Sequence, residues 1–260
     1  MEKPKQLFSL KDKIAVVIGG SGVLGGEMAQ ALAGAGAKTA IFYSGNVEGA
    51  EEQKSAIEKS GGEARIYQAD VRDQSSLQPA FDKVTSQWGT VDVLVNAPGV
   101  NSTTPVMEIT DEEWDLIMDV NLKGVFLASR IAAEIMIESN TAGSIINISS
   151  ASSEIPLSEV FTYSISKAGV NNMTKFLARE WALHNIRVNA ILPGFFPAEQ
   201  NREILTDERT EAIFNHTMMG RFGKPQELAG ALLWLASNEA SSFVTGAIVP
   251  VDGGFTAMTI

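Results

Sequence analysis

Short apolar segments rich in β-branched residues alternate along the chain with longer segments of helical periodicity. The apolar segments predict seven strands, at residues 13–18, 39–43, 65–69, 91–95, 144–148, 186–192 and 247–251. Helices are expected between them, among others over 74–88, 110–139 and 225–234. Because this alternation is typical of a parallel sheet covered by helices on both faces, we expect one α/β domain over residues 1–260. Its sheet would be parallel, doubly wound and about seven strands wide.

The first predicted strand is followed by a glycine-rich segment, Gly-Gly-Ser-Gly-Val-Leu-Gly-Gly, at residues 19–26. Glycines in a strand-to-helix turn let backbone N–H groups approach a pyrophosphate, and the N-terminus of the helix adds the positive end of its dipole. A tight turn can also need glycine for its backbone angles alone. Because the segment lies in the first strand–turn–helix unit, the sequence favours a Rossmann-like dinucleotide site.

Tyr163 and Lys167 lie four residues apart at the start of a segment with helical periodicity. At that spacing both side chains share one face of a helix. An ammonium group stabilises a nearby phenolate, so it lowers the pKa of the tyrosine and suits it to general acid–base work. Ser150 follows the strand at 144–148, where its hydroxyl could hold a substrate oxygen. The same Tyr–Lys pair is also compatible with two ordinary exposed helix residues.

Composition excludes several classes of function. With 20 basic and 31 acidic residues the net charge is −11, which disfavours nucleic acid and anionic membrane surfaces as partners. The N-terminal segment has no apolar signal core and no apolar run is long enough to span a bilayer, so we expect a cytoplasmic protein. There is no cysteine, and the two histidines fit no zinc spacing, so we expect no metal site.

Taken in order, the motifs resemble those of the short-chain dehydrogenase/reductase family over essentially the full chain. The opening motif of the family, Thr-Gly-x-x-x-Gly-x-Gly, is matched by Gly19 and Gly25, with Ile18 in place of threonine and a valine in place of the middle glycine. The family motif Asn-Asn-Ala-Gly is matched at its ends by Asn96 and Gly99. Segments near the start and after residue 193 look similar to a bacterial subgroup of D-mannonate oxidoreductases (fructuronate reductases).

This resemblance implies a catalytic set made of Asn121, Ser150, Tyr163 and Lys167. Tyr163 would exchange a proton with the substrate oxygen, and Lys167 would lower its pKa and hold the nicotinamide ribose. Ser150, which fits the position of the family serine better than Ser149, would orient the reacting group. Asn121 would help hold a water of the proton relay. The family also assembles homotetramers through its long helices, and an apolar face with Ile117, Phe126 and Ile131 is compatible either with assembly or with the core of one chain.

The resemblance also implies which residues contact the dinucleotide. They are Gly19, Ser21, Gly22, Leu24, Gly25, Tyr43, Ser44, Asp70, Val71, Asn96, Ala97, Gly99, Tyr163, Lys167, Pro193, Gly194 and Phe196. The end of the second predicted strand, residues 42–46, carries neither the carboxylate that would bind the ribose hydroxyls of NAD nor an arginine for the 2′-phosphate of NADP. Since nothing there repels a phosphate, we expect NADP(H) to be favoured, with NAD(H) possible.

Substrate residues are expected after the Pro-Gly turn at 193–194. Arg202 could clamp a substrate carboxylate with its planar fork, and Gln200, Asn201 and Asn101 could bind sugar hydroxyls. Ser150 is also expected to contact the substrate. Arg202 could equally be a surface residue paired with a neighbouring glutamate. His216 could reach the same pocket, although a structural role is more common for a lone histidine before a turn.

The sequence therefore predicts an enzyme that transfers a hydride between NAD(P) and the carbonyl or secondary alcohol of a sugar acid such as fructuronate or mannonate. One alternative is reduction of another carbonyl, such as a 3-oxoacyl thioester or a simple ketone. A second alternative is a protein that binds a dinucleotide without turnover.

Overall fold

A computed structural model describes residues 4–197 and 206–258. Its seven strands form one parallel sheet in the order β3-β2-β1-β4-β5-β6-β7. This confirms the predicted single-domain, Rossmann-like α/β fold, with strand ends shifted by at most two residues. The bounds are β1 Ile14–Ile18, β2 Lys38–Tyr43, β3 Glu63–Gln68, β4 Val93–Asn96, β5 Ser144–Ile148, β6 Arg187–Pro193 and β7 Ile248–Val251.

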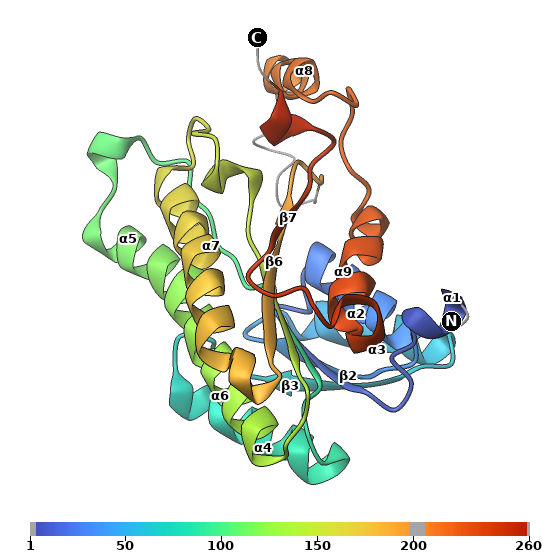
Figure 1. Cartoon of the computed structure of the whole chain (residues 1–260). Coiled ribbons are helices and arrows are strands. Elements are labelled where there is room, and N and C mark those ends of the chain that lie inside the picture. Colours follow the sequence, from blue (N-terminus) through green and yellow to red (C-terminus); the bar gives the residue numbers. More distant parts are fainter. Residues whose placement is uncertain (1–3, 198–205, 259–260) are drawn as a thin grey trace.

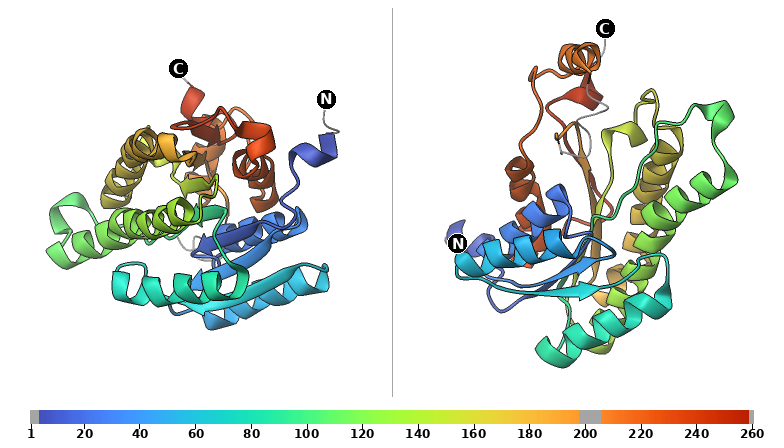
Figure 2. Two further views of the ribbon diagram at one scale, coloured as in Figure 1. Left: turned by 60° about the horizontal axis from the view of Figure 1, so that its bottom comes forward. Right: turned by 180° about the vertical axis from the view of Figure 1, so that it is seen from behind.

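Helices cover both faces of this sheet (Figures 1 and 2). α2 (Val23–Gly34), α3 (Val47–Lys59) and α9 (Ala229–Ala236) pack on one face. α4 (Gln74–Trp88), α6 (Gly124–Glu138) and α7 (Phe161–Trp181) pack on the other. The remaining helices are α1 (Pro4–Leu7), α5 (Asp111–Met118), α8 (Asp207–His216) and α10 (Asn238–Ser241).

Strand order places the site. β1 has β2 on one side and β4 on the other, so the connections that leave their carboxyl ends diverge to opposite faces. In parallel sheets ligands bind in the crevice at such a switch point. Here the glycine-rich turn after β1 and the turn after β4 lie at that switch point.

The central strands are buried on both sides, which is why they read as continuous apolar runs rather than as an alternating pattern. In β1, Val16 faces the side of α4, α6 and α7, while Val17 faces the side of α2, α3 and α9. Ile117 and Ile131 belong to the core of the chain, being 2% and 0% exposed, whereas Phe126 is 37% exposed. None of the helices in the described part of the chain has the length and apolar character needed to cross a bilayer.

Two helical regions differ from the sequence predictions. The helix expected over 110–139 begins at the predicted N-cap Thr110, whose side chain accepts a hydrogen bond from the N–H of Glu113. It is interrupted by a π-helical turn, Asp119–Lys123, which carries the buried Asn121. α8 lies where only a variable loop was expected, because its polar sequence has no strong apolar period. Thr206 caps it through the N–H of Arg209.

Candidate active site

Lys167 is the most buried charged group near the carboxyl end of β5. It is 3% exposed, and its Nζ donates hydrogen bonds to the carbonyl oxygens of Ile148 (2.9 Å) and Pro98 (3.3 Å). Ile148 is the last residue of β5 and Pro98 lies in the turn after β4, so the ammonium links the ends of these two neighbouring strands. The same Nζ lies 5.6 Å from the centre of the Tyr163 ring. The spacing of four residues on α7 therefore brings the pair together as predicted.

Ser150 and Ser149 point in different directions because consecutive residues of an extended segment face opposite sides. Ser149 is 2% exposed, and its hydroxyl shares its one proton between the carbonyl of Lys167 and the hydroxyl of Ser153, each 3.3 Å away. Ser150 is partly exposed, and its hydroxyl forms a hydrogen bond with Tyr163. The structure thus places Ser150, rather than Ser149, beside the phenol.

Burial dominates the electrostatics of this cluster. It raises the pKa of Tyr163 above its ordinary value, and the hydrogen bond with Ser150 opposes that rise. Burial also lowers the pKa of Lys167 from 10.5 to about 8. The expectation that Lys167 makes the phenol unusually acidic is therefore not met in this state, since desolvation of the phenolate outweighs the favourable interactions.

Asn121 anchors the loop that follows β4. Its side chain accepts a hydrogen bond from the N–H of Val100 (2.9 Å) and donates to the carbonyl of Val100 (2.9 Å) and to the hydroxyl of Ser166 (3.1 Å). The fully buried amide is thus committed to protein groups. Its side chain therefore holds the loop beside α7, and the predicted role of Asn121 in holding a water of the proton relay remains a prediction.

A second anchor holds the same loop farther along. The carboxylate of Glu113 on α5 accepts hydrogen bonds from the hydroxyls of Ser102 and Thr104, both at 2.7 Å. Because Glu113 is itself fixed by the N-cap of α5, the loop over residues 99–104 is tied to two helical segments. This loop borders the catalytic cluster: a side-chain carbon on Gly99 would lie 3.8 Å from Lys167 Nζ.

The glycine-rich turn is shaped by close contacts within the backbone. Gly19 has a positive φ of 75°, and a Cβ there would lie 2.7 Å from the carbonyl oxygen of Ala97 in the neighbouring turn. A Cβ on Gly25 would overlap the carbonyl oxygen of Gly19. No side chain among the described residues caps α2 at Gly22, so its first N–H groups remain available to an anion. These residues fit a dinucleotide pyrophosphate.

We expect Gly25→Ala to destabilise the turn and Gly22→Ala to be tolerated. The added methyl of the first variant overlaps backbone, which typically costs about 1–3 kcal/mol, whereas a Cβ on Gly22 would be 3.5 Å from the Gly19 carbonyl, an ordinary contact. Thermal unfolding of the two variants and the parent measures the difference. Equal midpoints for both variants would contradict this account of the turn.

The segment after β2 lies beside the same turn. Asn46 caps α3 by accepting the N–H of Gly49 (2.9 Å), and its amide donates to the carbonyl of Ser21 (3.4 Å). Tyr43 is partly buried, and the exposed hydroxyl of Ser44 remains free of these tasks. Ser44 is therefore better placed than Asn46 to meet a group on the adenosine ribose.

Comparison with known proteins settles the family. A family model described as enoyl-(acyl carrier protein) reductase matches residues 21–256. The chain belongs to the short-chain dehydrogenase/reductase family. Like its dehydrogenase relatives, this short-chain dehydrogenase/reductase is an NAD(P)-dependent oxidoreductase acting on CH–OH groups.

Several relatives span nearly the whole chain. "Uncharacterized oxidoreductase UxuB" of Bacillus subtilis (strain 168) is 40% identical over 96% of each chain. 3beta-hydroxysteroid dehydrogenase 1 of Eggerthella lenta is 40% identical over 95% of each. 2-dehydro-3-deoxy-D-gluconate 5-dehydrogenase of Formosa agariphila is 35% identical over 96% of this chain and 95% of its own. A gluconate 5-dehydrogenase from Burkholderia cenocepacia J2315, solved in complex with NADP and tartrate, is 32% identical, with a TM-score of 0.93 over 99% of this chain and 100% of its own.

The motif residues of this short-chain dehydrogenase/reductase lie together at the carboxyl ends of the strands. The glycine-rich turn, with Gly19, Ser21, Gly22, Leu24 and Gly25, follows β1. Tyr43 is the last residue of β2, and Ser44 comes directly after it. Asp70 and Val71 lie after β3, and Ala97 and Gly99 lie after β4. Asp70 is engaged by Arg72, whose guanidinium donates to the carboxylate at 2.7 Å and lowers its pKa. Val71 packs against the helix that begins at Gly124, because a Cβ on that glycine would lie 2.7 Å from a Val71 methyl.

The side chain of Asn96 lies beneath the site, and the predicted contact of this residue with the cofactor remains a prediction. It is fully buried, and its amide nitrogen donates to Ser129 (2.9 Å) and to Asn147 (2.9 Å), which in turn donates to Thr174 (2.9 Å). These residues come from β4, α6, β5 and α7, so the side chain of Asn96 joins a polar network beneath the site. It supports the turn after β4 rather than facing the crevice.

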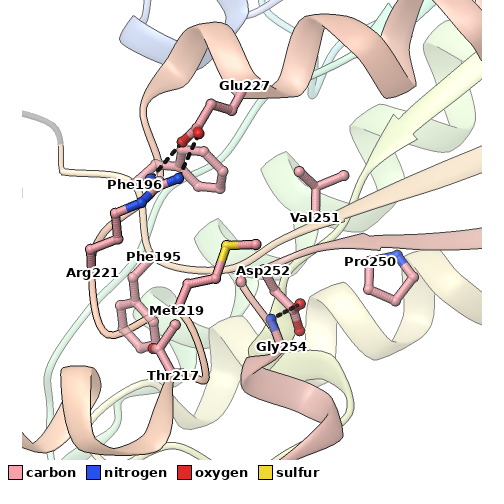
Figure 3. Close-up of a pocket in the computed structure, with 12 residues that line it drawn as sticks. Phe195, Phe196, Thr217, Met219, Arg221, Glu227, Pro250, Val251, Asp252 and Gly254 are labelled. Atoms are coloured by element: carbon pink, nitrogen blue, oxygen red, sulfur yellow. Dashed lines mark hydrogen bonds and ion pairs between the residues drawn. The ribbon is translucent and has the colours of Figure 1, made fainter.

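The turn after β6 needs glycine because a neighbouring strand end comes close. A Cβ on Gly194, directly after Pro193, would lie 2.7 Å from the Cα of Asp252. Phe196 is 9% exposed and lines a cavity of about 370 Å³ between the ends of β6 and β7 (Figure 3). The lining of that cavity does not include Ser150, Tyr163 or Lys167. Arg221 also lines this cavity, and its two terminal guanidinium nitrogens donate hydrogen bonds to the carboxylate oxygens of Glu227 at 2.7 Å and 2.8 Å.

Gln200 and Arg202 lie outside the described residues, so their predicted contacts with substrate remain predictions. His216 ends α8 and packs edge-on against Phe255, with ring centres 4.6 Å apart. Its Nε2 is buried without a hydrogen-bond partner in the described part of the chain. The ring contact is consistent with the structural role considered for this histidine.

Sequence reasoning missed the side chains that hold the site rather than form it. The contacts of Glu113 and Asn46 with distant loops were not foreseen, because an N-cap or a first-turn acid looks the same in sequence whether or not its side chain also reaches such a loop. Ser152 was overlooked within a run of serines. The Ser-x-Ser spacing at 150 and 152 is the only signal the sequence offers for it.

Proposed function

We propose that the enzyme interconverts a ketone and a secondary alcohol on a sugar acid, such as fructuronate and mannonate, with NADP(H) favoured and NAD(H) possible. The observation that carries the proposal is the cluster of Ser150, Tyr163 and Lys167 beside the switch point of the sheet. Two relatives support the substrate class by their names: a 2-dehydro-3-deoxy-D-gluconate 5-dehydrogenase and a gluconate 5-dehydrogenase. Asn101 and Thr103 are exposed in the loop that Glu113 holds and supply polar side chains at the same edge.

The residues of this chain define the proton chemistry. The N-terminus of α2 and the glycine-rich turn would bind the pyrophosphate, and the bound nicotinamide would supply or accept the hydride. Tyr163 would give its proton to the substrate oxygen during reduction and take it back during oxidation. Ser150 would donate a hydrogen bond to the same oxygen, and the charge on Lys167 would stabilise the phenolate as the proton leaves.

A screen of cofactor oxidation tests the proposal. Purified enzyme is supplied with NADPH or NADH and with hexuronates, ketogluconates, a 3-oxoacyl thioester, simple ketones or 3-keto steroids. We expect the highest kcat/KM with an acidic sugar. Activity confined to uncharged ketones would instead assign the enzyme to the reduction of another carbonyl. The 40% identical 3beta-hydroxysteroid dehydrogenase favours this candidate function. Tight dinucleotide binding with no turnover on any of these would favour a non-catalytic binder.

Cofactor preference can be altered at the end of β2. We expect Ser44→Asp to lower the ratio of kcat/KM for NADPH to that for NADH by at least about tenfold, because a carboxylate there repels a 2′-phosphate and binds ribose hydroxyls. Asn46→Asp is the control: it adds the same charge and preserves the cap of α3, gives up the hydrogen bond to the Ser21 carbonyl, and should change the ratio less than Ser44→Asp. An unchanged ratio in Ser44→Asp would place the phosphate elsewhere.

We also propose that the enzyme works as a cytoplasmic homotetramer. Large apolar side chains are exposed on the outer helices, including Phe126 (37%) on α6 and Phe161 (45%) and Phe176 (58%) on α7. A monomeric mass by light scattering at micromolar concentration would rule the tetramer out.

A further inference from the structure

Ser150 has a neighbour that uses up the accepting capacity of its hydroxyl. The N–H of Ser152 donates to Ser150 Oγ at 3.3 Å, and the hydroxyl of Ser152 donates to the same atom at 3.1 Å. Ser152 is 4% exposed and lies in the single 3₁₀ turn, Ala151–Ser153, that Ser150 caps. The arrangement is local and buried, so it is set by the fold of the turn.

The hydrogen-bonding inventory of a serine hydroxyl gives this arrangement a consequence. A hydroxyl has one donor and two acceptor positions. With both acceptor positions of Ser150 taken by Ser152, only its proton remains for a further partner. Tyr163 is the partner present in the structure, and the reacting oxygen of a substrate would lie beside the same phenol.

We infer that Ser152 is a positioning residue that commits Ser150 to donate its hydrogen bond to the reacting oxygen. The inference rests on the proposed catalytic role of Ser150. During reduction negative charge develops on that oxygen, and a donor fixed in advance stabilises the charge without having to reorient. An acceptor at the same place would oppose it.

The other serines of the turn have different tasks. Ser153 donates to the backbone carbonyl of Ser150 at 2.6 Å and accepts a hydrogen bond from the amide of Asn171 at 2.8 Å. Ser149 donates to Ser153 and to the carbonyl of Lys167. Neither contacts the hydroxyl of Ser150 among the hydrogen bonds of the described residues. Ser153 therefore provides a matched control within the same turn.

The kinetic test compares Ser152→Ala, Ser153→Ala, Ser150→Ala and the double variant of residues 150 and 152. We expect Ser152→Ala to lower kcat for ketone reduction by about three- to tenfold with little change in KM, the effect of one hydrogen bond. In the Ser150→Ala background the second change should have no further effect on kcat. Loss of the same factor in both backgrounds would show that Ser152 acts independently of Ser150 and would overturn the inference.

A titration of the phenol tests the same point without substrate. Lys167 on the same helix is the charged group facing the Tyr163 ring. In Ser152→Ala the freed hydroxyl of Ser150 can accept the proton of the phenol instead of donating to the phenolate, so the apparent pKa of Tyr163 should rise. Ultraviolet difference spectra measure it, with Tyr163→Phe subtracted to remove the two other tyrosines. Ser153→Ala should titrate like the parent.

The two measurements separate the inference from the proposed function. A raised pKa in Ser152→Ala together with no turnover of sugar acids would keep the positioning role and reject the substrate class. An unchanged pKa in Ser152→Ala, or an equal rise in Ser153→Ala, would reject the positioning role whatever the substrate.

Discussion

Tyr163→Phe should reduce turnover by about 10²- to 10⁴-fold, the range associated with loss of a positioned proton donor or acceptor. The ring remains, so its contact with Lys167 is preserved, while the oxygen that exchanges the proton is removed. The measurement is the initial rate of NADPH oxidation with the best substrate of the screen.

Two controls distinguish lost chemistry from lost structure. The thermal midpoint of Tyr163→Phe should stay close to that of the parent, because the phenol forms its side-chain hydrogen bond with Ser150 at a partly exposed position. The affinity for NADPH, followed by quenching of protein fluorescence, should also be retained. Parental turnover in this variant would reject Tyr163 as the proton-transfer group and with it the proposed mechanism.

Lys167→Met should lower kcat by about 10²-fold or more. Removing the ammonium should also abolish the pH dependence of kcat that its titration causes. Burial lowers the pKa of Lys167 to about 8, so in the parent the ammonium is present below that pH and is lost above it. Reduction by the parent should therefore decline as the pH rises through about 8. The residual activity of Lys167→Met should not show that step in a pH profile of kcat.

The burial of Lys167 should also make the free energy of unfolding depend on pH. Its pKa in the folded state is about 8, below the ordinary value of 10.5, so between these values the unfolded chain binds more protons than the folded chain. The free energy of unfolding of the parent, relative to Lys167→Met, should therefore increase as the pH rises through this window. Denaturant unfolding at intervals from pH 7 to pH 10.5 measures the difference, and a constant difference would contradict the burial cost assigned to the ammonium.

The fold was largely predictable because its pattern is local. Each buried strand is a short apolar run, and each glycine-rich turn stands directly after one, so the order of strand, turn and helix can be read along the chain. The interruption of the helix at Asp119–Lys123 was not predictable, because a π-helical turn needs no special residue and is maintained here by the bonds of Asn121 to Val100 and Ser166. α8 was missed because its stability depends on caps and on contacts such as that of His216 with Phe255 rather than on periodicity.

The sequence by itself determined that Tyr163 and Lys167 share one face of a helix, because their spacing of four residues fixes this wherever that helix lies. Only the tertiary structure decided how those groups are tuned. The burial of the Asn96 side chain in a polar network, and the partner that directs the hydroxyl of Ser150, depend on segments that are distant in sequence or on rotamers within one turn. Burial of the ammonium likewise arises from the turns after β4 and β5 closing over it, and this desolvation sets the pKa values of the pair.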